Sequence, residues 1–200
     1  MEEIPKYQNE IDRILSRYRI SENKNDDYIN EEMPSTNRLF GLKDLLDYYG
    51  ANKNWNTLEI GSYAGASSEL IARYVQSLIC CDIWEEYISP PERAKYVYAE
   101  FQETKKRNTN IIEFKKKSNI LAKELNGYEF DMIYIDADHS YESVKNDISV
   151  WFNKVKPGGI ICGHDYFMDD VKKAVDEFFG ISNIKYFKDS SWSFQKSLEI

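Results

Sequence analysis

Two short segments of the sequence place acidic and histidine side chains directly behind apolar runs. Asp136, Asp138 and His139 follow one run, and His164 and Asp165 follow another. Carboxylate oxygens are ligands for divalent cations, and an imidazole with an ordinary pKa of about 6.5 can accept a proton at neutral pH. If the two runs are neighbouring strands, the segments predict a site that combines a divalent cation with a general base.

Each of these side chains also has a purely structural interpretation. Asp138 or Ser140 could cap a helix that follows the first run, and an isolated histidine is more often structural than catalytic. The chain has only 2 histidines, however, and both lie beside acids at the end of an apolar run. This placement favours the functional interpretation.

Residues 58–67, Leu-Glu-Ile-Gly-Ser-Tyr-Ala-Gly-Ala-Ser, have the pattern of a strand, a glycine turn and a helix. Gly61 and Gly65 allow the backbone to turn tightly and approach a ligand, and the N-terminus of the helix offers free N–H groups. The G-x-x-x-G spacing lacks the middle glycine of the dinucleotide fingerprint G-x-G-x-x-G. The segment indicates a nucleotide-type site, and a glycine-tolerant turn without a ligand is the alternative.

Asp82 ends the next apolar run, 23 residues after Glu59. In folds with this order a carboxylate at that place binds the hydroxyls of a ribose, and the nearby Trp84 could flank an adenine ring. The alternatives are a helix cap or a solvated turn acid for Asp82 and a core position for Trp84.

The elements that would position these residues are visible as short apolar runs that alternate with helical patterns. We expect strands at 57–60, 78–81, 111–114, 130–135 and 160–162, with helices that begin near Ser67, Glu92, Asn119 and Tyr141 and another at 171–179. This alternation predicts an α/β fold with a Rossmann-like parallel sheet covered by helices on both faces. Two further runs, 183–188 and 192–196, predict a closing antiparallel hairpin.

The N-terminal part has a different pattern. Apolar residues recur at three- and four-residue intervals from Ile4 to Tyr18, which predicts an amphipathic helix, and the polar stretch 21–32 follows it. A second amphipathic helix is expected at 39–49. We therefore expect residues 1–32 to form a helix and a polar linker that pack on or cap a single main domain at 33–200.

Composition excludes several classes of protein. The 200 residues carry 26 Lys and Arg against 34 Asp and Glu, and the resulting net charge of −8 argues against binding to nucleic acid. No apolar run reaches the roughly 18 residues that a membrane span needs. The acidic start does not resemble a signal peptide, and the 3 cysteines have no zinc-site spacing. We expect a cytoplasmic protein that binds neither membranes nor nucleic acids, and a homo-oligomer is compatible with the sequence.

With these motifs the chain resembles the class I S-adenosylmethionine-dependent methyltransferases, and most closely the small O-methyltransferases of the catechol and macrolide-sugar types. The resemblance covers residues 33–200 and makes that part the methyltransferase domain. It implies that Asp82 binds the ribose of S-adenosylmethionine and that Ser118 and Asn119 meet the adenine. The remaining residues implied at the cofactor surround its methionine part: Glu59, Gly61, Ser62, Tyr63, Gly65 and Ser67.

The same resemblance implies a divalent metal, Mg²⁺ or Mn²⁺, at Asp136, His164 and Asp165, with His139 as the general base and Asp138 as its rival. Relatives generally have a carboxylate where this chain has His164. Imidazole is a poor ligand for Mg²⁺ and suits Mn²⁺, Fe²⁺ or Zn²⁺ better. Either the ion is not Mg²⁺ or the His164 side chain points away from the metal site.

The expected function is transfer of a methyl group from S-adenosylmethionine to a hydroxyl of a small molecule or sugar. One alternative is a protein that binds S-adenosylmethionine without catalysis, which would follow if His164 has abolished the metal site. Another is an NAD-dependent oxidoreductase, which the missing middle glycine opposes.

Overall fold

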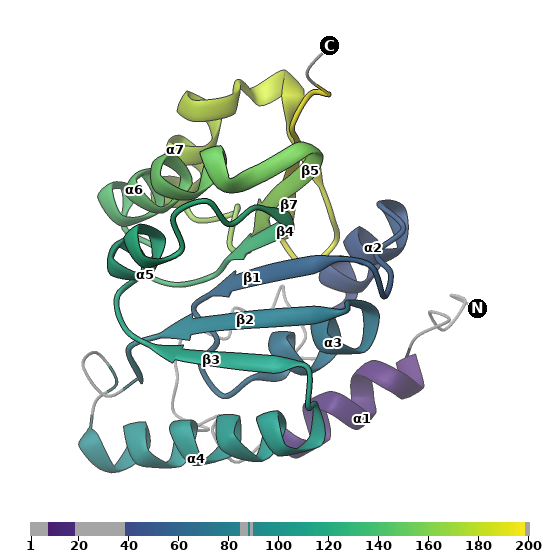
Figure 1. Ribbon diagram of the computed structural model, residues 1–200, viewed down its shortest axis with the longest axis vertical. Helices are drawn as coiled ribbons and strands as arrows, with labels where there is room; N and C mark the ends of the chain where they lie inside the picture. The colour runs from purple at the N-terminus through teal and green to yellow at the C-terminus, as the bar shows by residue number, and fades with distance from the viewer. Residues whose placement is uncertain (1–7, 19–38, 85–87, 89, 199–200) are drawn as a thin grey trace.

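The computed structural model of the chain describes residues 8–18, 39–84, 88 and 90–198 (Figure 1). The polar linker expected at 21–32 and the first residues of the expected N-terminal helix lie outside these ranges. None of the helices within them combines the length and apolar character that a membrane-spanning segment requires.

The centre of the structure is a seven-stranded sheet in the order β3-β2-β1-β4-β5-β7-β6. The first five strands pair in parallel, and β7 pairs antiparallel with both β5 and β6. The predicted parallel sheet and its antiparallel C-terminal closure are therefore confirmed. The strands are β1 (Asn56–Ile60), β2 (Ser77–Asp82), β3 (Ile111–Lys115), β4 (Phe130–Ile135), β5 (Val155–Gly163), β6 (Lys185–Tyr186) and β7 (Trp192–Gln195).

Helices cover both faces of the sheet, and each face has its own buried cluster. Successive strand residues point to opposite faces, so that Cys80 belongs to one cluster and Cys81 to the other. One face carries α1 (Gln8–Tyr18), α2 (Phe40–Tyr48), α3 (Ala66–Tyr74) and α4 (Pro91–Arg107). The other carries α5 (Ser118–Glu124), α6 (Tyr141–Trp151) and α7 (Asp169–Phe179), which lie together in Figure 1.

The carboxyl ends of the parallel strands meet at one edge of the sheet. Ile60 at the end of β1 pairs with Cys81 of β2 on one side and with Ile135 of β4 on the other, and Ile135 pairs with Gly163 of β5. The strand order reverses between β1 and β4, and ligands of open α/β sheets bind at such a point. The loops that follow these four strands carry most of the residues singled out in the sequence.

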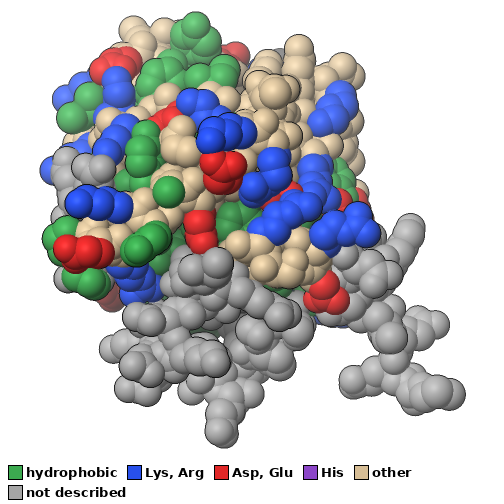
Figure 2. Space-filling view, turned by 90° about the horizontal axis from the view of Figure 1, so that it is seen from below, with side chains coloured by type: hydrophobic (Ala, Val, Ile, Leu, Met, Phe, Trp, Pro, Cys, Tyr) green, Lys and Arg blue, Asp and Glu red, His purple; other side chains and the backbone are tan. Residues whose placement is uncertain are grey.

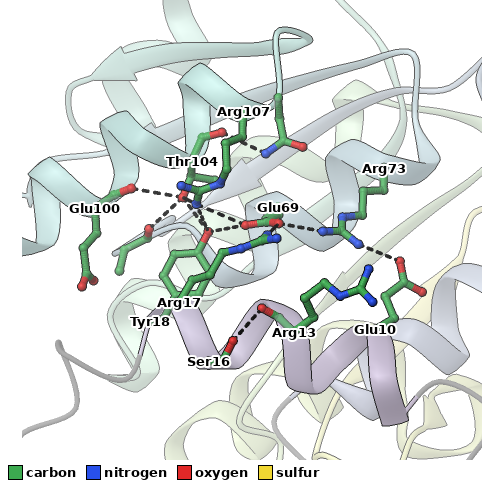
Figure 3. A network of polar contacts seen from close by, with 12 residues as sticks. Glu10, Arg13, Ser16, Arg17, Tyr18, Glu69, Arg73, Glu100, Thr104 and Arg107 are labelled. Atoms are coloured by element: carbon green, nitrogen blue, oxygen red, sulfur yellow. Dashed lines mark hydrogen bonds and ion pairs between the residues drawn. The ribbon is translucent and has the colours of Figure 1, made fainter.

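The first helix is packed onto the domain. Ile11 and Ile14 are completely buried, and Tyr18 is nearly so. At the C-terminal end of α1, the Tyr18 hydroxyl donates to Glu69 of α3 at 2.8 Å and contacts the hydroxyl of Thr104 in α4 at 2.5 Å (Figure 3). The helix thus bridges α3 and α4 through its last residue.

Glu69 is the centre of the polar network drawn in Figure 3. Its side chain is only 2% exposed and forms ion pairs with Arg73 at 2.7 Å, with Arg107 at 3.3 Å and with Arg17 of α1. Burial alone would raise the pKa of Glu69, but the hydrogen bond from Tyr18 and those from Arg73 and Arg17 lower it below the ordinary value. The buried carboxylate is therefore compensated by groups from three helices.

Lys and Arg side chains gather on the face seen from the side of α4 (Figure 2). Two basic residues of α4 have acidic partners: Lys106 pairs with Glu103 at 2.5 Å, and Lys105 pairs with Glu113 of β3 at 2.9 Å. This basic surface is accordingly neutralised in part by neighbouring carboxylates.

Candidate active site

The glycine loop between β1 and α3 is shaped by two close approaches. Gly61 has a φ of +85°, and a Cβ there would lie 2.0 Å from the backbone oxygen of Asp136. Gly65 has a φ of +94°, and a Cβ there would lie 3.0 Å from the hydroxyl oxygen of Thr104. Both positions therefore require glycine for its conformation and for the space it leaves. Tyr63 between them also has a positive φ, 45°.

Glu59 is a buried acid beneath this loop. Its carboxylate accepts hydrogen bonds from the Ser62 hydroxyl at 2.7 Å and from the Ser68 hydroxyl, and the Cys80 thiol lies at 3.4 Å. Oε1 has no hydrogen-bond partner among the described residues. Burial raises the pKa of Glu59, although the surrounding hydroxyls, Ser67 among them, oppose this effect. Ser62 and Ser67, two of the residues predicted at the methionine part, thus lie beside the Glu59 carboxylate.

Asp82, at the end of β2, holds the backbone of the same loop. Its Oδ2 accepts the N–H groups of Ser62 and Tyr63, each at 2.9 Å, and its Oδ1 accepts the N–H of Trp84 at 2.7 Å. Asp82 therefore adjoins the glycine loop as the sequence predicts. The structure adds that Asp82 anchors the loop, and the ribose contact stays a prediction.

The structure places Trp84 in the core, which was the alternative interpretation of this residue. Its ring is completely buried, 4.6 Å from that of Phe101 and 5.2 Å from that of Tyr98 between centroids. The indole Nε1 donates to the backbone oxygen of Tyr63 at 2.7 Å. A ring enclosed in this way has no free face for an adenine, so the structure does not support the proposed flanking role.

Ser118 and Asn119 begin α5, directly behind β3. They lie near the end of β2, because the N–H of Lys116 donates to the backbone oxygen of Asp82 at 3.1 Å. Asn119 is exposed, whereas Ser118 is half-buried. The Ser118 hydroxyl donates to Asp147 of α6 at 2.6 Å.

Asp147 was not singled out in the sequence. It is nearly buried, and burial raises its pKa to about 6. A signal was available: Asp147 interrupts the apolar face of the helix formed by Val144, Ile148 and Trp151. An acid at such a position usually has a specific partner.

The acids behind β4 and β5 converge as predicted, but the histidine that joins them is His139. Ligand atoms of Asp136, His139 and Asp165 all lie within 4.8 Å of one another. His139 Nε2 is 2.9 Å from Asp165 Oδ2 and 3.6 Å from Asp136 Oδ1. His164 is not one of this group.

His164 instead lies behind Asp165. Its Nδ1 is 3.2 Å from Asp165 Oδ1, and its buried Nε2 has no hydrogen-bond partner among the described residues. The side chain lines a cavity of about 10 Å³ that also reaches His139. Asp165 has a φ of 56°, a conformation that is uncommon for a residue other than glycine and is found at functional sites. His164 is thus placed to orient Asp165.

The electrostatics of the cluster favour bound positive charge. The carboxylates of Asp136 and Asp165 raise the pKa of His139 to about 10. Burial alone would lower the pKa of His164, but Asp165 and Asp136 raise it to about 9. Burial would raise the pKa of Asp165, and the two imidazoles lower it far below its usual range. A divalent cation between the carboxylates would take the place of these protons.

One of the two separations given above matches the spacing of ligand atoms around a cation, whereas the 3.6 Å between His139 and Asp136 exceeds it. Adjacent ligand atoms of an octahedral ion with bonds of about 2.1 Å lie about 3.0 Å apart. The separation between His139 Nε2 and Asp165 Oδ2 is 2.9 Å. Two carboxylates and one imidazole form a donor set that suits Mn²⁺ or Fe²⁺ better than Mg²⁺.

Asp138 lies two residues before Ser140, which is the N-cap residue of α6, and no side chain of the described residues caps this helix. Asp138 Oδ1 accepts the backbone N–H of Ser140 at 2.8 Å, at the start of α6. This hydrogen bond lowers the pKa of Asp138 below its ordinary value. The side chain is nevertheless exposed and next to His139.

Comparison with known proteins gives a family and a fold. The profile of a family described as "Methyltransferase domain" matches residues 58–166. No curated protein sequence matches the chain. The matched residues run from β1 to the loop after β5 and include the glycine loop and the acid cluster.

Solved structures with the same fold share little sequence with the chain. A candidate O-methyltransferase from Klebsiella pneumoniae superimposes with a TM-score of 0.63 at 17% identity, over 94% of this chain and 90% of that one. The O-methyltransferase of Bacillus cereus in complex with SAH gives 0.60 at 16% identity, over 96% and 91%. The TDP-rhamnose 3′-O-methyltransferase of calicheamicin biosynthesis gives 0.58 at 12% identity, over 98% and 96%.

The family match covers more than half of the chain, and the sheet order and the glycine loop agree with it. The predicted resemblance to the class I methyltransferases is therefore confirmed. The chain belongs to the methyltransferase domain family.

Proposed function

We propose that this methyltransferase transfers the methyl group of S-adenosylmethionine to a hydroxyl of a small molecule or sugar at a site that holds a divalent cation. One observation carries the proposal: the glycine loop directly contacts the acid cluster, since Gly61 abuts the backbone of Asp136. A cofactor on the loop would thereby lie next to an acceptor at the cluster. The SAH complex of the Bacillus cereus enzyme and the sugar-nucleotide substrate named for the calicheamicin enzyme support this choice.

The loop residues supply the cofactor site. Gly61, Ser62, Tyr63 and Gly65 present backbone to the ligand, and Ser67 lies at the N-terminus of α3. Glu59 accepts the Ser62 hydroxyl beneath this backbone and has one carboxylate oxygen free of partners among the described residues. Asp82 is positioned at the end of β2 for the ribose, and Ser118 and Asn119 are positioned at the end of β3 for the adenine.

Asp136 and Asp165 are the residues we assign to the cation. A divalent cation held by them would lower the pKa of the acceptor hydroxyl. His139 accepts the proton of the acceptor hydroxyl, or Asp138 accepts it instead. The O–CH₃ bond forms as the S–CH₃ bond breaks, and the products are the methyl ether and S-adenosylhomocysteine.

His139 can act as a base only when the negative charge of the neighbouring carboxylates is balanced by another cation. Held between Asp136 and Asp165 with a pKa of about 10, it is protonated at neutral pH and cannot accept a proton. A cation bound to the two acids would lower the pKa of His139 toward its ordinary value. The 2.9 Å approach to Asp165 also favours a second role for His139, that of third ligand to the cation.

The two roles of His139 predict different behaviour of His139→Ala. A ligand role predicts that Mn²⁺ affinity, measured by calorimetry, falls at least tenfold. A base role predicts unchanged Mn²⁺ affinity and a fall in kcat of about 10² to 10⁴. Asp138→Ala provides the comparison: a larger loss of kcat there than in His139→Ala would assign the base to Asp138.

Calorimetric titration with S-adenosylmethionine and with NAD, each with and without Mn²⁺, tests the proposed function as a whole. We expect binding of S-adenosylmethionine and no binding of NAD, because the loop lacks the middle glycine that a pyrophosphate requires. Transfer of labelled methyl groups to a panel of catechols and sugar nucleotides then separates an enzyme from a protein that only binds the cofactor. Binding of NAD alone would overturn the proposal.

We also retain the proposed division of the chain into residues 1–32 and a methyltransferase domain at 33–200. The packing of α1 on α3 and α4 supports the expectation that the N-terminal part packs on the domain. Deletion of residues 1–32 tests it: a chain that still folds and binds the cofactor would show that the domain is complete without this part.

A further inference from the structure

The hydroxyl of Ser118 has most of its hydrogen-bonding capacity already occupied. It donates its proton to Asp147 Oδ1 at 2.6 Å and accepts the indole N–H of Trp151 at 2.7 Å. Asp147 is 7% exposed and Trp151 is completely buried. Both partners come from α6, which packs on α5 beneath the strand ends.

A serine hydroxyl has one proton to donate and two lone pairs that accept. With the proton directed at Asp147 and one lone pair taken by Trp151, one lone pair remains. Above its pKa of about 6 the Asp147 side chain is a carboxylate, which only accepts hydrogen bonds. Asp147 therefore cannot donate to Ser118, and the Ser118 proton stays directed at Asp147. The hydrogen-bonding group that Ser118 can still offer to a ligand is therefore one acceptor lone pair.

The position of Ser118 makes this property relevant to the cofactor. Ser118 begins α5 at the ligand-binding edge of the sheet, and the preceding segment is hydrogen-bonded to Asp82 through the Lys116 N–H at 3.1 Å. Ser118 itself is half-buried. A base whose ribose is held at Asp82 would lie beside it.

We infer that Asp147 is a specificity-determining residue, which acts through Ser118 to select a 6-amino purine over a 6-oxo purine. The inference rests on the proposed S-adenosylmethionine site. The 6-amino group of adenine donates hydrogen bonds and matches the remaining lone pair. A 6-oxo group only accepts hydrogen bonds. At the same place two acceptors, the 6-oxo oxygen and the Ser118 lone pair, would face each other without a proton between them. Asp147 is a positioning residue here, because it fixes the direction of the Ser118 proton.

The test compares S-adenosylhomocysteine with its 6-oxo analogue, S-inosylhomocysteine, by calorimetry at pH 7.5. We expect the wild-type chain to bind the adenosyl compound at least about tenfold more tightly, because a mismatched polar pair in a buried site costs about 1–3 kcal/mol. In Asp147→Ala the Ser118 hydroxyl can rotate and donate to a 6-oxo group. The preference should then fall at least fivefold, mainly through tighter binding of the inosyl compound.

Two further variants complete the experiment. Ser118→Ala removes the acceptor and should reduce the preference by weakening the binding of the adenosyl compound. This variant keeps the inference testable if Asp147→Ala does not fold. Asn146→Ala, an exposed neighbour on α6, should leave the preference unchanged.

The possible failures can be told apart. A wild-type chain that binds neither compound would overturn the proposed function and the inference with it. A wild-type chain that binds both equally would overturn only the inference. The same holds if folded Asp147→Ala and Ser118→Ala both keep the wild-type preference.

Discussion

The backbone oxygen of Asp136 lies 2.0 Å from the position that a Cβ would occupy on Gly61. The contact joins the end of β4 to the turn after β1, and the N–H of Asp136 donates to the backbone oxygen of Ile60 at 2.8 Å beside it. The glycine loop and the acid cluster are therefore directly joined at one junction. A disturbance on either side of this junction should be felt on the other.

Gly61→Ala should lower the free energy of unfolding by about 3 kcal/mol or more, because the new Cβ would overlap backbone that cannot move freely. The matched control is Gly127→Ala. Gly127 also has a positive φ, +83°, but a Cβ there meets nothing within 4 Å, so a cost of about 1 kcal/mol is expected. Urea unfolding of both variants checks the difference, and equal losses would contradict the close approach.

Asp82→Ala should destabilise the protein in the absence of any cofactor. Three backbone N–H groups would lose their acceptor, and each such loss in a buried position costs about 1–3 kcal/mol. Unfolding of the unliganded variant measures this effect separately from binding.

The ribose contact of Asp82 requires its own comparison, between 5′-methylthioadenosine and the 2′-deoxy analogue. If Asp82 binds the ribose, the wild type should prefer the ribose compound about tenfold and Asp82→Ala should not. A preference that survives in the variant would leave Asp82 only its role in the loop.

Asp165→Asn should reduce Mn²⁺ affinity more than His164→Gln does. Asp165 lies within the group of three ligand residues, whereas His164 lies outside it, with its Nδ1 3.2 Å from Asp165 Oδ1. Loss of such an orienting contact costs about tenfold in metal affinity, and loss of a charged ligand should cost more. Calorimetry with Mn²⁺ gives the order, and a greater loss in His164→Gln would restore His164 as a ligand.

Asp147→Asn should raise the free energy of unfolding at pH 8 and have little effect at pH 5. Burial raises the pKa of Asp147 to about 6, so the folded state binds a proton more tightly than the unfolded state does. The stabilisation from this proton is complete below the unfolded pKa and is lost as the pH rises through 6. The difference amounts to about 1–3 kcal/mol.

Urea unfolding at both pH values provides the measurement for Asp147→Asn. Glu142→Gln, at an exposed position of the same helix, is the control and should change neither value by more than about 0.5 kcal/mol. A variant that is equally destabilised at pH 5 and pH 8 would contradict the raised pKa.

The order of the elements could be read from the sequence because it depends on local patterns. Apolar runs and helical periodicity marked the five parallel strands and the helices after them, and the glycine turn at Gly61 marked the first strand end. Parallel strands align their carboxyl ends, so the alternation placed Asp136 and Asp165 at the same edge of the sheet. The fold and this shared edge were predictable for this reason, whereas the pairing of β4 with β5 that brings the two acids together was only a condition of the prediction.

Only the tertiary structure decided which side chains meet at that edge. The choice of His139 rather than His164 beside the acids depends on the positive φ of Asp165 and on side-chain directions that spacing does not determine. Trp84 enters the core because α4 covers it with Tyr98 and Phe101.

The buried polar pairs could not be predicted from the sequence either. Ser118 and Asp147 are 29 residues apart, and Tyr18 and Glu69 are 51 apart. Each pair exists because packing of distant helices buries both partners together, where a hydrogen bond compensates for lost water. Hydrophobic periodicity shows that a face is buried, but the partner across the interface is set by how the helices cross.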